Sequence, residues 1–312
     1  MIRYIAITGA AGFIGKHVVD ALAARGDYVY AVDAMTYAAQ PDWLSATAEQ
    51  FAPRVHVRPV DVRTLTRLPD VDAVVHLAAS THVDNSLSEA AEFVDNNVGS
   101  TAHLLELVRA KSQHGMPHYI HISTDEVYGS IAKGAVAEDT PLRPSSPYAA
   151  SKAAADMLVQ AWATTYGVPA TILRPTNTYG PGQYPEKLIP KVIRCAQLGH
   201  SFPIHGDGAQ TRCWLSVHDL VAAVLHVVDN TLLGTYNVGG NIEASVNAVA
   251  DYITGLASDN YISPTFGFER LACDHRYAVD DTKLRGTGWA PQGKFWADLP
   301  QLVAAERHAW RW

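Results

Sequence analysis

Short runs rich in β-branched residues alternate with helical patterns along the first half of the chain, and this alternation limits the folds open to it. The predicted strands are residues 2–7, 28–32, 55–60, 73–76, 118–123 and 170–173, and the predicted helices are residues 12–24, 90–110 and 147–166. Strands separated by helices pair in parallel through right-handed crossovers. The sequence therefore predicts an α/β fold with a doubly wound parallel sheet of the Rossmann type.

The pattern changes after Arg174, where prolines and glycines mark loops. A strand at 215–217, a helix at 219–228 and a strand at 235–238 are expected to return to the sheet. The remainder is expected to form a smaller lobe over the carboxyl edge of the strands, where open α/β sheets bind ligands. We thus predict a dinucleotide-binding domain of residues 1–175 plus about 213–240 and a substrate-binding lobe of residues 176–212 plus 241–312.

Composition excludes several classes of protein. Hydrophobic residues make up 48% of the chain and charged residues 18%, which is ample for a buried core. Lys and Arg total 24 against 31 Asp and Glu, and this net charge of −7 argues against nucleic acid as a partner. Cys195, Cys213 and Cys273 are too scattered for a disulfide framework or a zinc site. No apolar run approaches the ~20 residues that span a bilayer, so we expect a cytoplasmic protein without metal or membrane partner.

A glycine-rich loop follows the first predicted strand. It runs Gly9-Ala-Ala-Gly12-Phe13-Ile14-Gly15 and opens a helix. The first glycine permits the tight turn, the second lets the backbone approach a pyrophosphate, and the third lets helix pack on strand. The amino end of the helix offers unpaired N–H groups to phosphates. A glycine triplet alone is weak evidence, but its place in a βαβ unit favours dinucleotide binding over an ordinary turn.

Two aspartates after later strands extend this prediction. Asp33 ends the second strand, where a carboxylate accepts both adenosine ribose hydroxyls and repels a 2′-phosphate, which favours NAD over NADP. The alternative role for Asp33 is a helix or turn cap. Asp61, followed by Val62 after the third strand, could place a carboxylate near the adenine, although a turn aspartate explains it equally well.

Tyr148 and Lys152 lie four residues apart and so share one helix face. Such a pair arises by chance in many helices, but this helix follows the strand ending at Thr124, so both hydroxyls could converge beside a nicotinamide. A phenol of pKa ~10 is a poor base at neutral pH. A lysine charge within ~4 Å at an effective dielectric near 20 contributes ~4 kcal/mol. We therefore expect Lys152 to lower the pKa of Tyr148 by about three units.

Asp125 and Glu126 follow Thr124 directly. In a regular strand they would point to opposite faces, and a solvated pair at a strand end is the default interpretation. Both can serve one site only if the chain leaves strand geometry there, which Gly129 and the long following loop make plausible.

With the glycine loop and the Tyr148/Lys152 pair in register, the chain resembles the extended short-chain dehydrogenase/reductase superfamily over nearly its whole length. A more specific likeness is to the nucleoside-diphosphate-glucose 4,6-dehydratases, best known for dTDP-glucose. The motifs that carry it are Ser123-Thr-Asp-Glu-Val-Tyr-Gly129, Ser146-Pro-Tyr-Ala-Ala-Ser-Lys152, His76-Leu-Ala-Ala79, Thr81-His-Val-Asp84, Asn177-Thr-Tyr-Gly-Pro181, Pro185-Glu-Lys-Leu-Ile-Pro190, Gly206-Asp-Gly208 with Arg212, and Arg276-Tyr-Ala-Val-Asp280.

The resemblance implies an enzyme that works in three stages with NAD. Tyr148, with Lys152 and Thr124, assists hydride removal from C4 of the hexose. Glu126 then removes the C5 proton while protonated Asp125 gives its proton to the departing C6 hydroxyl, and hydride returns to C6. Adjacent carboxyls in a water-poor site have their pKa values pushed apart, which supplies one acid and one base.

The resemblance also implies contacts with both ligands and a second subunit. Residues expected around the cofactor, besides those above, are Leu77, Ala78 and Ala79. Residues expected around the nucleotide sugar are Thr81, His82, Asn177, Lys187, Leu188, Arg212, Asn247 and Arg270. The helices at 90–110 and 147–166 are expected to pair with a second copy as a four-helix bundle.

Some residues depart from the dehydratase pattern and keep alternatives open. Cys213, Thr178, Cys273 and Ser80 stand where acidic, Asn, His and Glu residues are usual, which leaves the choice of base and sugar open. A UDP-glucuronate decarboxylase or a nucleotide-sugar 4-epimerase shares the C4 oxidation but needs no donor for C6 hydroxyl loss, so Asp125 discriminates between them. A non-catalytic NAD-binding sensor would be free to lose the catalytic trio, which this chain retains.

Overall fold

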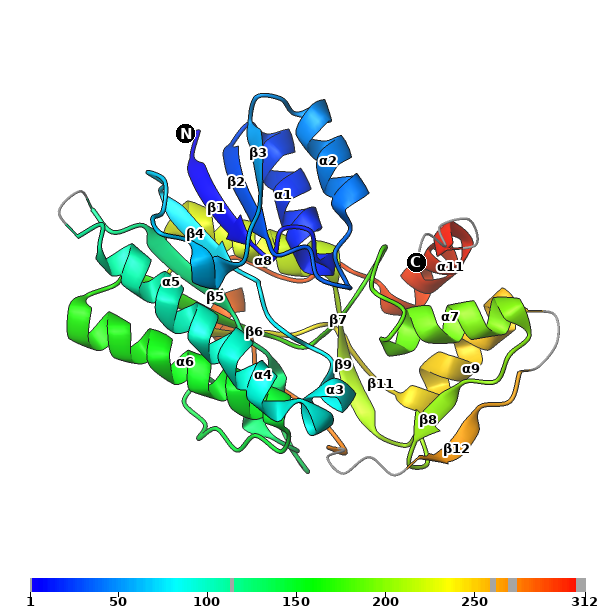
Figure 1. Ribbon diagram of the computed structural model, residues 1–312. Coiled ribbons are helices and arrows are strands. Elements are labelled where there is room, and N and C mark those ends of the chain that lie inside the picture. The colour runs from blue at the N-terminus through cyan, green and yellow to red at the C-terminus, as the bar shows by residue number, and fades with distance from the viewer. Residues whose placement is uncertain (1, 113–114, 259–261, 269–273, 307–312) are drawn as a thin grey trace.

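In the computed structural model, which describes residues 2–112, 115–258, 262–268 and 274–306, the strands of the first half form one parallel sheet (Figure 1). Its order is β10-β6-β5-β4-β1-β2-β3, with every neighbouring pair parallel. The strands are β1 (Tyr4–Thr8), β2 (Tyr28–Asp33), β3 (Val55–Pro59), β4 (Ala73–His76), β5 (His118–Ile122), β6 (Ala170–Pro175) and β10 (Gly234–Val238). The predicted doubly wound α/β fold is confirmed.

Helices cover both faces of this sheet (Figure 1). One face carries α1 (Phe13–Arg25), α2 (Pro41–Gln50) and α8 (Val217–Asn230), and the other carries α4 (Ala90–Val94), α5 (Ser100–Arg109) and α6 (Pro147–Tyr166). Strand β1 shows the cause, because successive side chains point to opposite faces. Ile5 and Ile7 pack under α1 and α8, whereas Ala6 packs under α5 and α6. Both faces are buried, as parallel sheets require.

The helix predicted over 90–110 is interrupted. Between α4 and α5 lies a π-helical turn, η2 (Asp95–Gly99). The buried Asn97 in this turn donates to Ser80 O at 3.0 Å and to Ser151 Oγ at 2.9 Å, and it accepts from Ser80 N at 2.8 Å. The π turn therefore coincides with a side chain that joins the loop after β4 to helix α6, and a periodic apolar pattern carries no sign of such a bond.

The later elements form a second group. A three-stranded sheet contains β7 (Asn177–Tyr179), β9 (Thr211–Ser216) and β11 (Ile242–Ser245), and a two-stranded sheet contains β8 (Pro203–His205) and β12 (Thr265–Phe268). Against them pack α7 (Leu188–Leu198), α9 (Val246–Ala257) and α11 (Phe295–Glu306). Shorter elements are η1 (Val62–Thr64), α3 (Val83–Ser88), η3 (Asp125–Tyr128) and α10 (Thr282–Arg285).

One predicted strand was misplaced. The strand expected at 215–217 to return to the large sheet is β9, which pairs with β7 and β11 instead. Its Trp214 stacks on Phe295 at 5.2 Å and is buried with the α7, α9 and α11 helices. This apolar contact holds β9 in the second group, while α8 and β10 return to the large sheet as expected.

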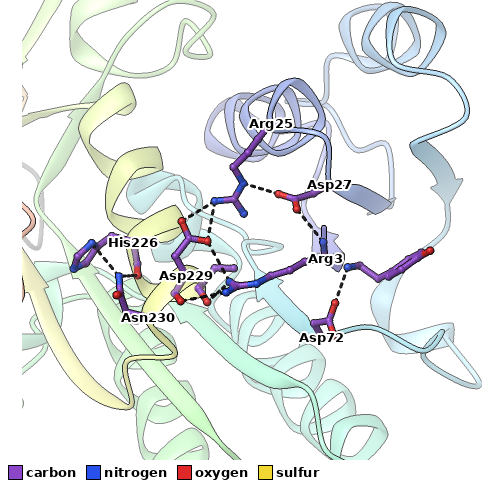
Figure 2. Close-up of polar contacts among 9 residues, drawn as sticks. Arg3, Arg25, Asp27, Asp72, His226, Asp229 and Asn230 are labelled. Atoms are coloured by element: carbon purple, nitrogen blue, oxygen red, sulfur yellow. Dashed lines mark hydrogen bonds and ion pairs between the residues drawn. The ribbon is translucent and has the colours of Figure 1, made fainter. Parts of the chain in front are cut away.

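A polar network closes the amino end of the large sheet (Figure 2). Asp229, at the end of α8, pairs with Arg25 of α1 at 2.9 Å and with Arg3 at 3.2 Å. Arg25 also pairs with Asp27 at 2.6 Å. These bonds lie at the end of the strands opposite the glycine loop. They join α1, α8 and the start of the chain there, and they leave the carboxyl edge of the sheet open to ligands. Among the residues described, no helix combines the length and the apolar character needed to cross a membrane.

Candidate active site

The glycine loop adopts a conformation that only glycines allow. Gly9 has φ of +70°, and a Cβ there would lie 2.7 Å from Ala78 N. A Cβ on Gly15 would lie 1.9 Å from Gly9 O, and one on Gly12 would lie 3.2 Å from the same oxygen. Gly12 is the N-cap of α1 and brings no side-chain acceptor to the first turn. Phe13 and Ile14 begin that helix, so the loop and the helix amino end have the form that a pyrophosphate requires.

Asp33 points back to this loop. Its Oδ2 accepts from Ala11 N at 2.9 Å and its Oδ1 accepts from Met35 N at 2.7 Å. Burial raises the pKa of the Asp33 carboxyl, and the two backbone N–H groups oppose that shift. Each carboxylate oxygen retains a further acceptor site. The turn-capping role and the ribose-binding role are therefore compatible at Asp33.

Asp61 is held by its own turn. It caps η1 by accepting from Arg63 N at 2.8 Å and pairs with the Arg63 guanidinium at 2.6 Å. These bonds lower the pKa of Asp61. Val62 is buried in the core on the α5 side of the sheet. The turn interpretation of Asp61 thus has direct structural support.

The loop after β4 runs beside the glycine loop. Leu77 N donates to Thr8 O at 3.1 Å and Ala78 N lies 3.3 Å from Thr8 Oγ1. Ala79 is half-buried, and the following Ser80 is the residue that Asn97 anchors. The three predicted cofactor residues therefore lie next to Gly9, at the carboxyl ends of β1 and β4.

Helix α6 presents the tyrosine and lysine. It begins at Ser146, whose Oγ accepts from Ala149 N at 3.1 Å, with Pro147 at the first helical position. Tyr148 and Lys152 are both buried. Lys152 Nζ donates to Ile122 O at 2.7 Å, so the ammonium is fixed at the end of β5.

The predicted lowering of the Tyr148 pKa is wrong, because the surrounding protein raises this pKa. Burial raises the pKa of the phenol, and the Glu126 charge raises it further, whereas a hydrogen bond with Thr124 acts in the opposite direction. Burial also lowers the pKa of Lys152 to about 8, against the attraction of Asp156. The attraction of the lysine charge is outweighed by the desolvation of the phenol and by the neighbouring carboxylates.

The chain leaves strand geometry directly after β5. Thr124 is extended and caps the 3₁₀ turn η3, accepting from Glu126 N at 3.3 Å. Gly129 then has φ of +73°, and a Cβ there would lie 2.3 Å from Arg143 O. The turn removes the strand alternation that would separate Asp125 from Glu126. The predicted departure from strand geometry is confirmed.

Asp125 is an acid whose pKa the site strongly perturbs. Burial raises its pKa to about 8, the Glu126 charge adds to this, and the Arg212 charge opposes it. Thr124 Oγ1 donates to Asp125 Oδ1 at 3.3 Å. Its buried Oδ2 has no hydrogen-bond partner among the described residues. At neutral pH this carboxyl is mostly protonated, and one oxygen remains available to a ligand.

One contact between predicted substrate residues bridges the two groups of elements. Lys187, the N-cap of α7, donates to Thr81 O at 2.8 Å, and Leu188 begins that helix. His82, the N-cap of α3, lies 2.8 Å from Asn85 Oδ1.

The others lie on the second group. Arg212 on β9 donates to Asp274 O at 2.9 Å and lies over the Tyr277 ring at 4.5 Å. Asn177 on β7 and Asn247 on α9 each have a buried Oδ1 without a hydrogen-bond partner in the described chain. Such atoms are suited to ligand donors. Arg270 lies outside the described residues.

Tyr277 was missed as a site residue. It is buried, contacts Arg212 and donates to Asp274 Oδ2 at 2.8 Å. Burial and then the Glu126 charge raise its pKa, which places the phenol near the carboxylate pair. The Arg276-Tyr-Ala-Val-Asp280 motif was the available signal, but nothing in the sequence ties position 277 to Glu126.

A glycine loop on β1, an acidic residue ending β2 and a Tyr/Lys pair on α6 define a dinucleotide-binding fold of the short-chain dehydrogenase/reductase class. Comparison with known proteins makes the assignment more specific. Residues 5–239 match the model of the NAD dependent epimerase/dehydratase family. The chain belongs to this family.

Named relatives cover almost the whole chain. The dTDP-glucose 4,6-dehydratase of Streptomyces griseus is 40% identical over 98% of this chain and 93% of its own length. The crystal structure of the dTDP-glucose 4,6-dehydratase DesIV from Streptomyces venezuelae, solved with NAD bound, is 35% identical, with a TM-score of 0.91 over 98% of this chain and 97% of that one. The UDP-glucuronic acid 4-epimerase of Bacillus cereus, solved with UDP-glucuronic acid and NAD, is 26% identical, with a TM-score of 0.91 over 98% and 100% of the two chains.

Proposed function

We propose that this protein is an NAD-dependent nucleoside-diphosphate-hexose 4,6-dehydratase that converts dTDP-glucose or UDP-glucose to a 4-keto-6-deoxy sugar. The observation that carries this proposal is the carboxylate pair at η3. Asp125 is buried, with a pKa raised to about 8, and it lies beside Glu126 and near Tyr148. C4 oxidation alone does not need such an acid, whereas expulsion of the C6 hydroxyl does.

The first stage, oxidation at C4, uses Tyr148, Thr124 and Lys152. Tyr148 accepts the C4 hydroxyl proton while Thr124 binds the same oxygen. Lys152 stabilises the phenolate by its positive charge, one helical turn away on α6. Bound NAD would supply the acceptor for the C4 hydride and the donor of hydride to C6, and its oxidised ring would add a positive charge. Gly9, Gly12, Gly15 and Asp33 would hold its pyrophosphate and ribose, in agreement with the cradle that a Cβ would fill.

Elimination falls to the carboxylate pair. The ketone at C4 acidifies the C5 proton, and Glu126 removes it and later returns a proton to C5 when hydride adds to C6. Asp125, protonated at neutral pH, gives its proton to the C6 hydroxyl, which leaves as water. The two acids act in opposite senses because Asp125 is desolvated and lies in the field of Glu126.

The nucleoside diphosphate would lie across the second group of elements. Arg212 supplies a charge-assisted donor to the diphosphate, and Lys187 a second cation at the start of α7. The unpartnered amide oxygens of Asn177 and Asn247 provide acceptors for hydroxyl or base N–H groups. In this proposal the nucleotide sugar is also contacted by Thr81, His82, Leu188 and Arg270.

We further propose that the protein is a cytoplasmic homodimer. Its three cysteines are too few to imply an oxidising compartment. Val94 on α4 and Met157 on α6 are 51% and 60% exposed, and these helices lie side by side on the outer face of the sheet (Figure 1). A second copy would cover this apolar face.

The epimerase and decarboxylase alternatives are tested by mass. Incubation of the purified protein with dTDP-glucose and, separately, UDP-glucose should give a product lighter by one water. A product of unchanged mass and altered sugar configuration would indicate an epimerase. No product from any nucleotide hexose would refute the proposed function.

A further inference from the structure

The buried surroundings of Lys152 extend beyond Tyr148. Lys152 Nζ lies 3.5 Å from His121 Nε2 as well as 2.7 Å from Ile122 O. His121 is the fourth residue of β5, and its side chain is 0% exposed. The catalytic ammonium therefore contacts an imidazole that the proposed reaction does not use.

An acid lies near the same nitrogen of this imidazole. Asp156 Oδ1 is 3.7 Å from His121 Nε2, and Asp156 Oδ2 accepts from Arg174 Nε at 2.9 Å. Asp156 lies one turn after Lys152 on α6 and is also 0% exposed. Within the described part of the chain, His121 Nδ1 and Asp156 Oδ1 are buried without a hydrogen-bond partner. The Arg174 guanidinium thus bonds one oxygen of this buried carboxylate, and the other oxygen lies near His121 Nε2.

The protonation of His121 follows from its neighbours. Burial lowers its pKa well below the usual value, and the charge on Lys152 lowers it further. The imidazole is neutral, and in the tautomer that carries its proton on Nδ1 its Nε2 accepts from the Lys152 ammonium. In that tautomer His121 is an acceptor for Lys152, and Asp156, near the same Nε2, is the adjacent acid. Burial raises the pKa of Asp156, and the Arg174 charge opposes that shift and favours the ionised carboxylate.

We propose that His121 and Asp156 are positioning residues that keep the Lys152 ammonium charged and fixed, an inference that rests on the proposed role of Tyr148 and Lys152. Other groups from the surrounding elements share this field. They are His76 of β4, Asp125 and Glu126 of η3, Tyr148 of α6 and Arg174 of β6.

The expected sign follows from the balance at Lys152. Burial lowers its pKa to about 8, and the Asp156 charge opposes that fall. Because both distances through His121 are below 4 Å, Lys152 Nζ lies within about 8 Å of Asp156 Oδ1. Asp156→Asn should then lower the midpoint at which Lys152 loses its proton by about one pH unit or more. His121→Phe, which removes an acceptor but no charge, should lower it by about one unit or less.

The test follows the lysine itself. Protein carrying ¹³Cε-labelled lysine, with NAD bound, is titrated by NMR, and the Lys152 signal is assigned with Lys152→Arg. Lys16 serves as an internal control because burial lowers its pKa to about 7 at a site on α1. The Lys16 midpoint should be the same in wild type, Asp156→Asn and His121→Phe. His121→Gln, which returns an acceptor near the Nε2 position, should restore the Lys152 midpoint.

An unchanged Lys152 midpoint in Asp156→Asn, with the Lys16 midpoint intact, would overturn the proposal. Asp156→Asn could fail to fold because Arg174 loses its partner. The two His121 variants then decide: equal Lys152 midpoints in His121→Phe and His121→Gln would overturn the proposal. In turnover assays at rising pH, the activity of Asp156→Asn should begin to fall at a lower pH than that of wild type. A purely structural defect would instead reduce activity equally at every pH. The NMR titration of Lys152 does not depend on dehydration. Failure of the proposed function would therefore be seen separately, as wild-type protein that releases no water from the nucleotide sugar.

Discussion

Replacement of Asp125 by Asn separates the two halves of the proposed reaction. With a pKa of about 8, roughly nine in ten Asp125 side chains are protonated and neutral at neutral pH. Asparagine has the same shape and the same neutral charge, so the field around Tyr148 should change little. Only the transferable proton is lost. Removal of a general acid lowers the rate of its step by about 10²–10⁴-fold, so we expect water loss to fall by that factor while C4 oxidation continues.

The assay follows both halves in one incubation with dTDP-glucose in deuterated water. In Asp125→Asn the absorbance of reduced nicotinamide should accumulate, because the 4-ketone forms and cannot eliminate. Deuterium should still enter C5, since Glu126 is intact. The matched control, Glu126→Gln, should also accumulate reduced nicotinamide but should incorporate no deuterium at C5. Mass spectrometry of the nucleotide sugars reports water loss in both variants.

The pH dependence gives an independent reading of the same group. Because the donor must be protonated, elimination in wild type should be fastest below the Asp125 pKa and should fall as the pH rises through about 8. This limb should be absent from the residual elimination step of Asp125→Asn, measured separately from C4 oxidation, which depends on Lys152. If the variant lost C4 oxidation and elimination to the same extent, or kept the wild-type pH limb, Asp125 would not be the proton donor.

Three further outcomes are expected. Gly15→Ala should abolish NAD binding in calorimetry and lower the melting temperature, because its Cβ would lie 1.9 Å from Gly9 O; retained affinity would contradict the proposed cradle. Tyr148→Phe should reduce C4 oxidation by about 10²–10⁴-fold in single-turnover experiments while leaving nucleotide-sugar affinity near wild type, and a fall in affinity alone would assign it to binding. Asp229→Asn, which breaks the half-exposed ion pairs of Figure 2, should change the free energy of unfolding by less than about 1 kcal/mol and leave activity unchanged.

The sequence was sufficient for the large sheet because its central strands β1, β4, β5 and β6 are almost entirely buried and the strands alternate with helices. The prediction failed where a single side chain overrides the pattern. Asn97 lies in an apolar-periodic stretch, yet it joins Ser80 to Ser151 through a π turn. Likewise Trp214 draws β9 into the second group by stacking on Phe295, 81 positions away along the chain. Long-range contacts of this kind leave no local signal.

The chemistry of the site divides in the same way. Motifs predicted which side chains gather at the carboxyl ends of β1, β4 and β5, but they could not give the protonation states, which depend on burial. The Tyr148–Lys152 spacing indicated a lowered phenol pKa, whereas desolvation and Glu126 raise it. Desolvation acts at Asp125 too, and there it produces an acid with a pKa of about 8. Exclusion of water therefore keeps the tyrosine protonated and harder to ionise, and it keeps the aspartic acid a competent donor. The positive charge at Lys152 must then be maintained by its buried neighbours if the first step is to proceed.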